Sequence, residues 1–288
     1  YKMKPNSRLL LFLLVLISNN STAQLDLSKP FKECGQTGSF TLYDLKNKKW
    51  ISSDLKDSQK PSLPAWTFKI INTLIALESG DISGPDQLIK WPGYTDTVKY
   101  GYRPDIYHDI TIKEAFRLSA AWAYIEMAKK IGRENYRIYL TKSNYGNVDL
   151  TQADDDFWNF GDFAISPANQ IEILRGVYEE TLPFKKSSFK ILKEMMIETR
   201  TNEYTISAKT GWTRNEATEI GWWVGYLERK DNVYFFATRL IKDRKNPNPD
   251  FGRCRKEITL KLLRELKILD VAEQQSNWDY EIWLASAM

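Results

Sequence analysis

Residues 204–240 read YTISAKTGWTRNEATEIGWWVGYLERKDNVYFFATRL, and this stretch decides the fold. It holds three runs rich in aromatic and β-branched side chains, at residues 204–209, 220–229 and 233–240. Such side chains favour strands, and short polar turns such as Lys230-Asp231-Asn232 separate the runs. We therefore predict an antiparallel meander.

On either side of the meander the sequence changes to a helical period. Apolar residues recur at helical spacing from residue 68 until Gly80. We predict further helices over residues 111–132, 134–141, 166–178, 184–199 and 253–269, and a β-hairpin over residues 39–51. This order indicates an α+β fold, in which an antiparallel sheet is flanked by helices and a helical lobe is inserted between two parts of the sheet. The long polar loop over residues 144–163 is expected to be functional.

The length and composition are those of one soluble globular unit. The chain has 288 residues, enough to bury one large core but too few for several independent domains. Hydrophobic residues make up 42% of it and charged residues 27%, which is typical of globular proteins. We assign the single domain to residues 24–270, and the tail at 271–288 shows no clear period.

The first 23 residues predict a cleavable signal peptide. Three basic residues precede an apolar run over residues 9–17, and small residues at 21–23 favour cleavage after Ala23. The run is about half as long as the roughly 20 residues of a spanning helix, so we expect export to the periplasm without a stable membrane anchor. Cleavage lowers the formal net charge from +4 to about +1, which leaves no electrostatic argument for a nucleic-acid partner.

Two cysteines and one histidine limit the redox and metal chemistry. After export, Cys34 and Cys254 could form a disulfide if the two ends of the domain meet, and two separate thiols fit the sequence equally well. His108 has no close Cys or His neighbours, so we expect an ordinary loop residue and no metal. The run Asp154-Asp155-Asp156 is expected to be a solvated loop.

Three short motifs carry groups suited to acyl transfer. The first is PAWTFK at residues 64–69, where positions 66 and 69 share one face of a helix. The second is Ser119-Ala120-Ala121 and the third is Lys209-Thr210-Gly211. A hydroxyl beside a lysine amine is a common activated nucleophile, but position 66 holds Trp66.

Further motifs follow in a fixed order. They are Tyr145-Gly146-Asn147, Trp158 with Gly161, Ile165 and Ser166, Gly221-Trp222-Trp223-Val224-Gly225, and Arg255 near the start of the last predicted helix. Together with the first three motifs they resemble the class D (oxacillinase-type) serine β-lactamases, with the motif serine replaced by Trp66.

The resemblance implies a β-lactamase/penicillin-binding-protein-like fold and a β-lactam hydrolase of antibiotic resistance that forms an acyl-serine intermediate. Lys69 would be the general base, carboxylated by carbon dioxide, because burial lowers the pKa of an amine. Trp158 would hold the carbamate through its indole N–H, and Ser119 would relay a proton to the leaving nitrogen. Carbon dioxide is the one cofactor implied.

The resemblance also implies a site for the carboxylate of a β-lactam, the expected small-molecule partner. Lys209, Thr210 and Arg255 would bind it through charge-assisted hydrogen bonds, with Gly211 completing the motif. Backbone N–H groups of position 66 and Trp212 would form the oxyanion hole.

Two positions depart from the family pattern. An indole is no nucleophile for an amide and would fill the space of the β-lactam carbonyl, so Trp66 removes the covalent step. Thr67 is rotated by roughly 100° from position 66, and Ser62 lies in the upstream loop, so neither is a ready replacement. Ala121, where the family has valine, opens a small gap over Lys69.

Three functions remain for such a chain. The favoured one is a class D β-lactamase scaffold that is inactive or severely impaired through one substitution. The second is a β-lactam-binding or sensing pseudoenzyme that keeps Lys209 and Arg255. The third, a cell-wall transpeptidase or carboxypeptidase, shares the first and third motifs but would not be expected to combine Tyr145-Gly146-Asn147 with Trp158.

Overall fold

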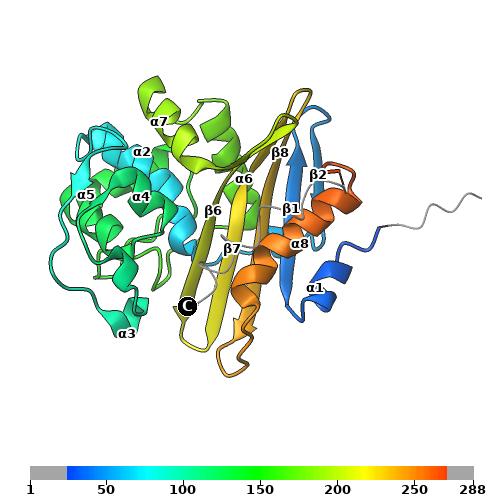
Figure 1. Cartoon of the computed structure of the whole chain (residues 1–288), viewed down its shortest axis with the longest axis horizontal. Helices are drawn as coiled ribbons and strands as arrows, with labels where there is room; N and C mark the ends of the chain where they lie inside the picture. Colours follow the sequence, from blue (N-terminus) through cyan, green and yellow to red (C-terminus); the bar gives the residue numbers. More distant parts are fainter. Residues whose placement is uncertain (1–24, 271–288) are drawn as a thin grey trace, which may run out of the picture.

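A six-stranded antiparallel sheet forms the centre of the computed structural model, which describes residues 25–270 (Figure 1). The predicted signal peptide at 1–23 and the tail at 271–288 lie outside the described residues. The strands stand in the order β2-β1-β8-β7-β6-β5. Their bounds are β1 (Gly38–Asp44), β2 (Lys49–Ser52), β5 (Ile197–Arg200), β6 (Tyr204–Asn215), β7 (Thr218–Arg229) and β8 (Val233–Asp243).

The predicted meander is confirmed as β6, β7 and β8, each longer than its aromatic run. Consecutive side chains of a strand point to opposite faces, so Trp222 and Trp223 enter two different cores. Both indoles are fully buried, and the N–H of Trp222 donates to the Leu63 carbonyl at 2.9 Å. The sheet is therefore covered on both faces.

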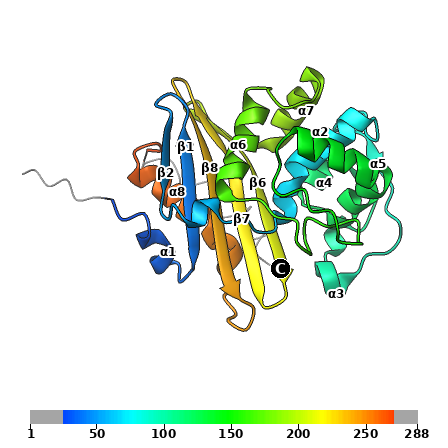
Figure 2. The same ribbon diagram turned by 180° about the vertical axis from the view of Figure 1, so that it is seen from behind.

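Helices provide these two covers (Figures 1 and 2). Helices α1 (Lys29–Glu33) and α8 (Phe251–Glu265) lie on one face, and α6 (Pro167–Tyr178) lies on the other. The remaining helices form a lobe beside β6, and they are α2 (Lys69–Ser79), α3 (Thr97–Tyr100), α4 (Ile112–Arg117), α5 (Ala121–Lys142) and α7 (Lys186–Met196). The predicted α+β plan, with a helical lobe inserted between parts of one sheet, is confirmed.

Short elements complete the lobe and its connections. A two-stranded sheet pairs β3 (Leu88–Ile89) with β4 (Ile110–Thr111). Three 3-10 turns are η1 (Asp57–Gln59), η2 (Ala65–Phe68) and η3 (Pro104–Ile106).

The single helix predicted over residues 111–132 is wrong. Thr111 caps α4 as expected, but α4 ends at Arg117, and α5 begins only at Ala121. Between them Ser119 has a φ of 56°, a left-handed conformation that no α-helix contains. The predicted helix end at Gly132 is confirmed, because a non-helical φ of 75° there divides Ala121–Lys142 into two helices at a kink, the second of which contains the helix predicted over residues 134–141.

The helix predicted over residues 184–199 is too long. Helix α7 ends at Met196, and the chain continues directly as the edge strand β5, which pairs with β6. The helix predicted over residues 166–178 is confirmed, with the Ser166 hydroxyl accepting from the Asn169 N–H at 3.1 Å. The closing helix α8 starts two residues earlier than predicted and ends at Glu265.

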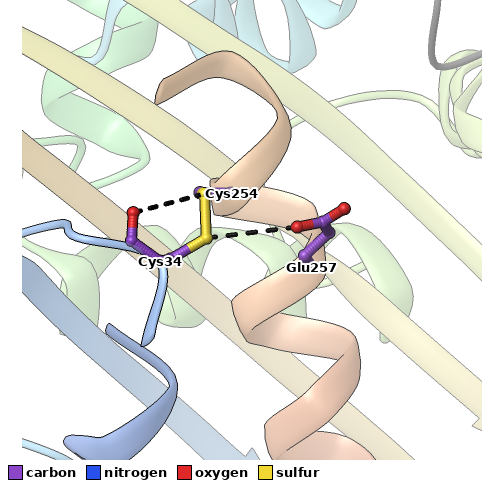
Figure 3. A group of neighbouring side chains, drawn as sticks. All are labelled: Cys34, Cys254 and Glu257. Atoms are coloured by element: carbon purple, nitrogen blue, oxygen red, sulfur yellow. Dashed lines mark hydrogen bonds between the residues drawn. A yellow bond between two sulfur atoms is a disulfide. The ribbon is translucent and has the colours of Figure 1, made fainter. Parts of the chain in front are cut away.

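A disulfide joins Cys34 to Cys254, which decides between the two alternatives that the sequence left open (Figure 3). Their Cα atoms are 6.1 Å apart across a sequence separation of 220, so the bond ties the segment after α1 to α8. Within residues 25–270 these sulfurs and the Glu257 carboxylate form the one group of three metal-type donors. Sulfurs bonded to each other are not thiolate ligands, and Glu257 pairs with Arg253.

None of the helices described is long and apolar enough to cross a membrane.

Candidate active site

The first motif lies on a tight turn that leads into a buried helix. Residues 65–68 form η2, and α2 starts at Lys69. Ala65 has a φ of 53°, and its N–H donates to the Trp158 carbonyl at 3.0 Å. The turn therefore holds Trp66 and Lys69 next to the loop that carries Trp158.

Carbonyl oxygens and aromatic rings surround the amine of Lys69, which is 1% exposed. Its Nζ donates to the carbonyls of Ala120 at 3.0 Å and Ala115 at 3.3 Å, and it lies 4.0 Å from the ring centroid of Tyr124. Burial holds the pKa of Lys69 well below its usual value, and the positive charges of Lys209 and Arg103 lower it further. The neutral amine is accordingly easier to reach than in an exposed lysine.

The indole of Trp66 lies against this amine. Its ring centroid is 5.0 Å from the Nζ of Lys69. The ring meets Trp158 edge to face and Tyr100 at a tilt, in both cases with centroids 6.3 Å apart. Trp66 is partly buried by these neighbours and packs on the main core. The side chain at position 66 therefore faces the lysine, as the motif spacing predicts.

Trp158 is fully buried and carries an unpaired donor. Its ring stacks on Phe68 with centroids 5.0 Å apart. The indole N–H has no hydrogen-bond partner among the described residues. Burying such a donor without an acceptor costs about 1–3 kcal/mol, so this N–H is free to donate to an acceptor at the site.

Ser119, between α4 and α5, lies in contact with Lys209 on β6. The Nζ of Lys209 donates to the Ser119 hydroxyl oxygen at 2.5 Å and to the Thr210 carbonyl at 3.2 Å. Lys209 is 4% exposed, and burial lowers its pKa from 10.5 to about 7. The second and third motifs are thus joined by a direct hydrogen bond.

Gly211 allows strand β6 to approach the first motif. A Cβ on Gly211 would lie 3.0 Å from both the Pro64 carbonyl oxygen and the Thr67 methyl group, a tight contact that these neighbours would have to relieve by moving slightly. Glycine therefore lets the third motif pack directly on the η2 turn without such a shift.

Arg255 supports the same strand from α8. Its Nη1 donates to the Gly211 carbonyl at 2.6 Å, and its Nε donates to the Gly252 carbonyl at 2.9 Å. Its guanidinium lies 5.7 Å from the ring centroid of Trp212, whose own N–H donates to Glu219. Burial lowers the pKa of Arg255 to about 10, so the group stays charged at neutral pH.

The two other hydroxyls considered for the nucleophile make hydrogen bonds elsewhere. Thr67 donates to the Pro64 carbonyl at 2.7 Å and accepts from Gln170 at 2.7 Å. Ser62 accepts from Arg239 at 3.0 Å. Both oxygens are engaged by groups other than Lys69.

The acidic run is not uniformly solvated, which corrects the prediction for residues 154–156. Asp154 is exposed, but Asp156 is 1% exposed and accepts from the Tyr100 hydroxyl at 2.6 Å. Lys99 bridges the two carboxylates, at 2.9 Å from Asp154 and 3.2 Å from Asp156. This cluster ties α3 to the loop at 144–163, beside Trp66.

Sequence reasoning missed two parts of the site. Tyr124 lies one helical turn after Ala121, so helical spacing could have placed it on the same face. Tyr100 and Lys99 had no comparable signal, because their partners lie more than 50 residues further along the chain. His108 is an exposed loop residue, as predicted, with both ring nitrogens near backbone carbonyls.

Comparisons with known proteins match most of this chain. The family model of the penicillin binding protein transpeptidase domain matches residues 37–264. β-Lactamase OXA-10 of Pseudomonas aeruginosa is 32% identical over 257 residues, which cover 88% of this chain and 93% of the relative. The structure of a class D β-lactamase from Sebaldella termitidis is similar with a TM-score of 0.80 and 40% identity, covering 86% of this chain and 98% of that one.

A regulatory protein, BlaR1 of Bacillus licheniformis, is also similar. It is 31% identical over 239 residues, which cover 83% of this chain and 38% of BlaR1.

The matched domain and the sheet with its flanking helices define a penicillin-binding/β-lactamase-like fold. Within that class, the chain belongs to the class D (OXA-type) β-lactamase family, whose members are serine hydrolases.

Proposed function

We propose that this chain is a class D β-lactamase scaffold that keeps the groups for β-lactam recognition but is disarmed at position 66. One observation carries the proposal: the Trp66 indole lies 5.0 Å from the amine of Lys69, in the position where the family's hydroxyl would face that amine. An indole cannot form the acyl intermediate, and its ring takes up space that a substrate carbonyl would need.

Within residues 25–270 no side-chain hydroxyl hydrogen-bonds to the Lys69 amine. The hydrogen bonds of Lys69 go to two backbone carbonyls, while Thr67 and Ser62 are bonded elsewhere. Loss of the nucleophile in serine hydrolases costs on the order of 10⁶ in turnover. Hydrolysis by the unaltered chain should therefore be near background.

The residues around Lys69 suit a carbamate formed with carbon dioxide. The amine is buried and its pKa is lowered. The indole N–H of Trp158 has no hydrogen-bond partner among the described residues, so it could donate to a carbamate oxygen. When bound, carbon dioxide would convert this amine into a general base. Phe68 and Tyr124, both fully buried, would keep water from the group.

Recognition of a β-lactam carboxylate is assigned to the third motif and α8. Lys209 and Arg255 are basic side chains from which water is largely excluded, and Thr210 follows Lys209 on β6. Charge-assisted hydrogen bonds to a carboxylate are about twice as strong as neutral ones, so these groups could orient a ligand once the indole no longer fills the place of its carbonyl. Ser119 would relay a proton to the leaving nitrogen if the covalent step were restored.

Replacing Trp66 by serine tests the proposal, and Trp66→Ala is the matched control. Both variants remove the indole, but only Trp66→Ser supplies a hydroxyl. We expect Trp66→Ser to hydrolyse a chromogenic cephalosporin at least about 1,000-fold faster than Trp66→Ala. Equal rates in the two variants, or enzyme-like turnover by the unaltered chain, would contradict the proposal.

A second candidate is a β-lactam-sensing pseudoenzyme, which the similarity to the regulatory protein BlaR1 favours. Such a protein would bind a penicillin without turning it over. Calorimetric titration of the unaltered chain separates the candidates, because the sensor should show saturable binding that is lost in Arg255→Ala.

We also propose that residues 1–23 direct export and are removed. The disulfide between Cys34 and Cys254 supports an oxidising compartment. The mass of the protein recovered from the periplasm of an expressing bacterium should correspond to a chain that starts at Gln24.

A further inference from the structure

Ser119 combines three features of an activated hydroxyl. It is partly exposed, so a small molecule can reach it. Its left-handed φ of 56° places it at the break between α4 and α5, away from the backbone pattern of either helix. Its oxygen lies 2.5 Å from the Nζ of Lys209, so the two groups are in direct hydrogen-bond contact.

Lys209 is surrounded in a way that favours its neutral form. Its Nζ lies 5.7 Å from the ring centroid of Phe116. Burial is the largest influence and lowers its pKa to about 7, while Glu198 on β5 raises it and Arg255 and Lys256 on α8 lower it. Lys69 on α2 is a further basic group near it, since the charge of Lys209 lowers the pKa of Lys69. A substantial fraction of Lys209 is therefore an uncharged amine at neutral pH, able to accept a proton.

We propose that Ser119 and Lys209 form a nucleophile–base pair that accepts acyl groups from small activated esters in this chain. Pairs of serine and lysine occur as nucleophile and base in other hydrolases. The reaction needs no hydroxyl at position 66 and differs from the proton relay assigned to Ser119 above. It deepens the proposed function, because it rests on the same site being accessible to acyl donors.

Each atom in this step has a partner. As the Ser119 oxygen bonds to the carbonyl carbon, the neutral amine of Lys209 takes the hydroxyl proton. With p-nitrophenyl acetate as the donor, the tetrahedral intermediate then breaks the bond between the carbonyl carbon and the aryl oxygen. The p-nitrophenolate leaves as a stable anion without needing a proton. The products are acyl-Ser119, p-nitrophenolate and a protonated Lys209, which returns its proton to solvent.

The indole of Trp66 restricts the donor to a small one. Because it occupies the space next to Lys69, a bicyclic β-lactam is hindered, whereas an acetyl group needs room for only two carbon atoms. The proposed substrates are thus small aryl or thiol esters.

Acetylation of the unaltered chain by p-nitrophenyl acetate tests the pair, with the modified residue located by peptide mass spectrometry. We expect acetyl-Ser119 to form first, at a rate that rises as the pH increases through about 7. Lys209→Met should slow this acetylation at least about 100-fold, the typical contribution of a general base. Ser83→Ala is the matched control, because Ser83 is an exposed serine bonded to the amide of Gln87 rather than to an amine, and this variant should label Ser119 normally.

Three outcomes would overturn the proposal. They are acetyl groups on lysines but not on Ser119, an unchanged rate in Lys209→Met, and a Ser119 rate with no rise between pH 6 and 8. Mapping and the pH profile use the unaltered chain, so they decide even where a variant fails to fold. If Trp66→Ser hydrolyses a cephalosporin while Ser119 stays unlabelled, this proposal fails and the proposed function stands. If Ser119 is labelled while Trp66→Ser is inactive, the proposed function fails and the proposal for Ser119 stands.

Discussion

Replacing Lys209 by methionine should raise the free energy of unfolding at neutral pH, because burying a charged amine destabilises the folded protein. Burial lowers the pKa of Lys209 from 10.5 to about 7, whereas the unfolded chain keeps the usual value. Between these two values the unfolded chain binds more protons than the folded one, so the free energy of unfolding rises with pH. The slope approaches about 1.4 kcal/mol per pH unit.

The size of the effect follows from that interval. Between pH 7 and 9.5 the titration of Lys209 should add about 3 kcal/mol to the free energy of unfolding. Methionine has a similar length and no charge, so Lys209→Met should lose this part of the pH dependence. Lys69 is buried in both proteins and contributes a similar rise to each.

Urea unfolding at pH 7, 8, 9 and 9.5 measures the difference between the two proteins. We expect the unaltered chain to gain about 3 kcal/mol relative to Lys209→Met over this range. If the free energies of unfolding of the two proteins changed in parallel with pH, Lys209 would be charged in the folded protein at pH 9. That result would refute both the lowered pKa and the proposed role of Lys209 as a base.

Three further perturbations test other parts of the structure. In the Trp66→Ser background, Trp158→Phe keeps an aromatic ring but removes the unpaired indole N–H. Bicarbonate-stimulated hydrolysis should therefore fall about tenfold. An unchanged rate would show that this N–H holds no bound group. Gly211→Ala places a methyl group 3.0 Å from a backbone carbonyl and should cost about 1–3 kcal/mol in thermal unfolding. The double variant Cys34→Ser/Cys254→Ser releases a cross-link spanning 220 residues and should lower the free energy of unfolding in urea by up to about 5 kcal/mol.

The sheet and most helices could be predicted because their patterns are local. The aromatic runs of β6 to β8 alternate between two cores, and the Ser166 cap starts α6 where the sequence places it. The break at Ser119 could not be predicted in this way, since the apolar period continues from residue 111 to 132. The carbonyls on either side of the break accept hydrogen bonds from Lys69, so the backbone there packs around a side chain from another helix.

The site was predictable where short motifs carry it and hidden where tertiary contacts complete it. Lys69 and Trp66 face one another because they lie three positions apart on one helical turn. The contacts of Tyr100 with Trp66 and Asp156 instead depend on how the loop at 144–163 folds over α3. The burial of Asp156 belongs to this second class, because an acidic run gives no sign of which carboxylate turns inward.

Covalent labelling by a penicillin tests the central claim most directly. The unaltered chain and Trp66→Ser are each treated with a fluorescent penicillin, quenched in acid after a short time and mapped by peptide mass spectrometry. We predict an acyl group at residue 66 of the serine variant and none on the unaltered chain. A penicilloyl group on any site residue of the unaltered chain would show that the indole does not disarm this site.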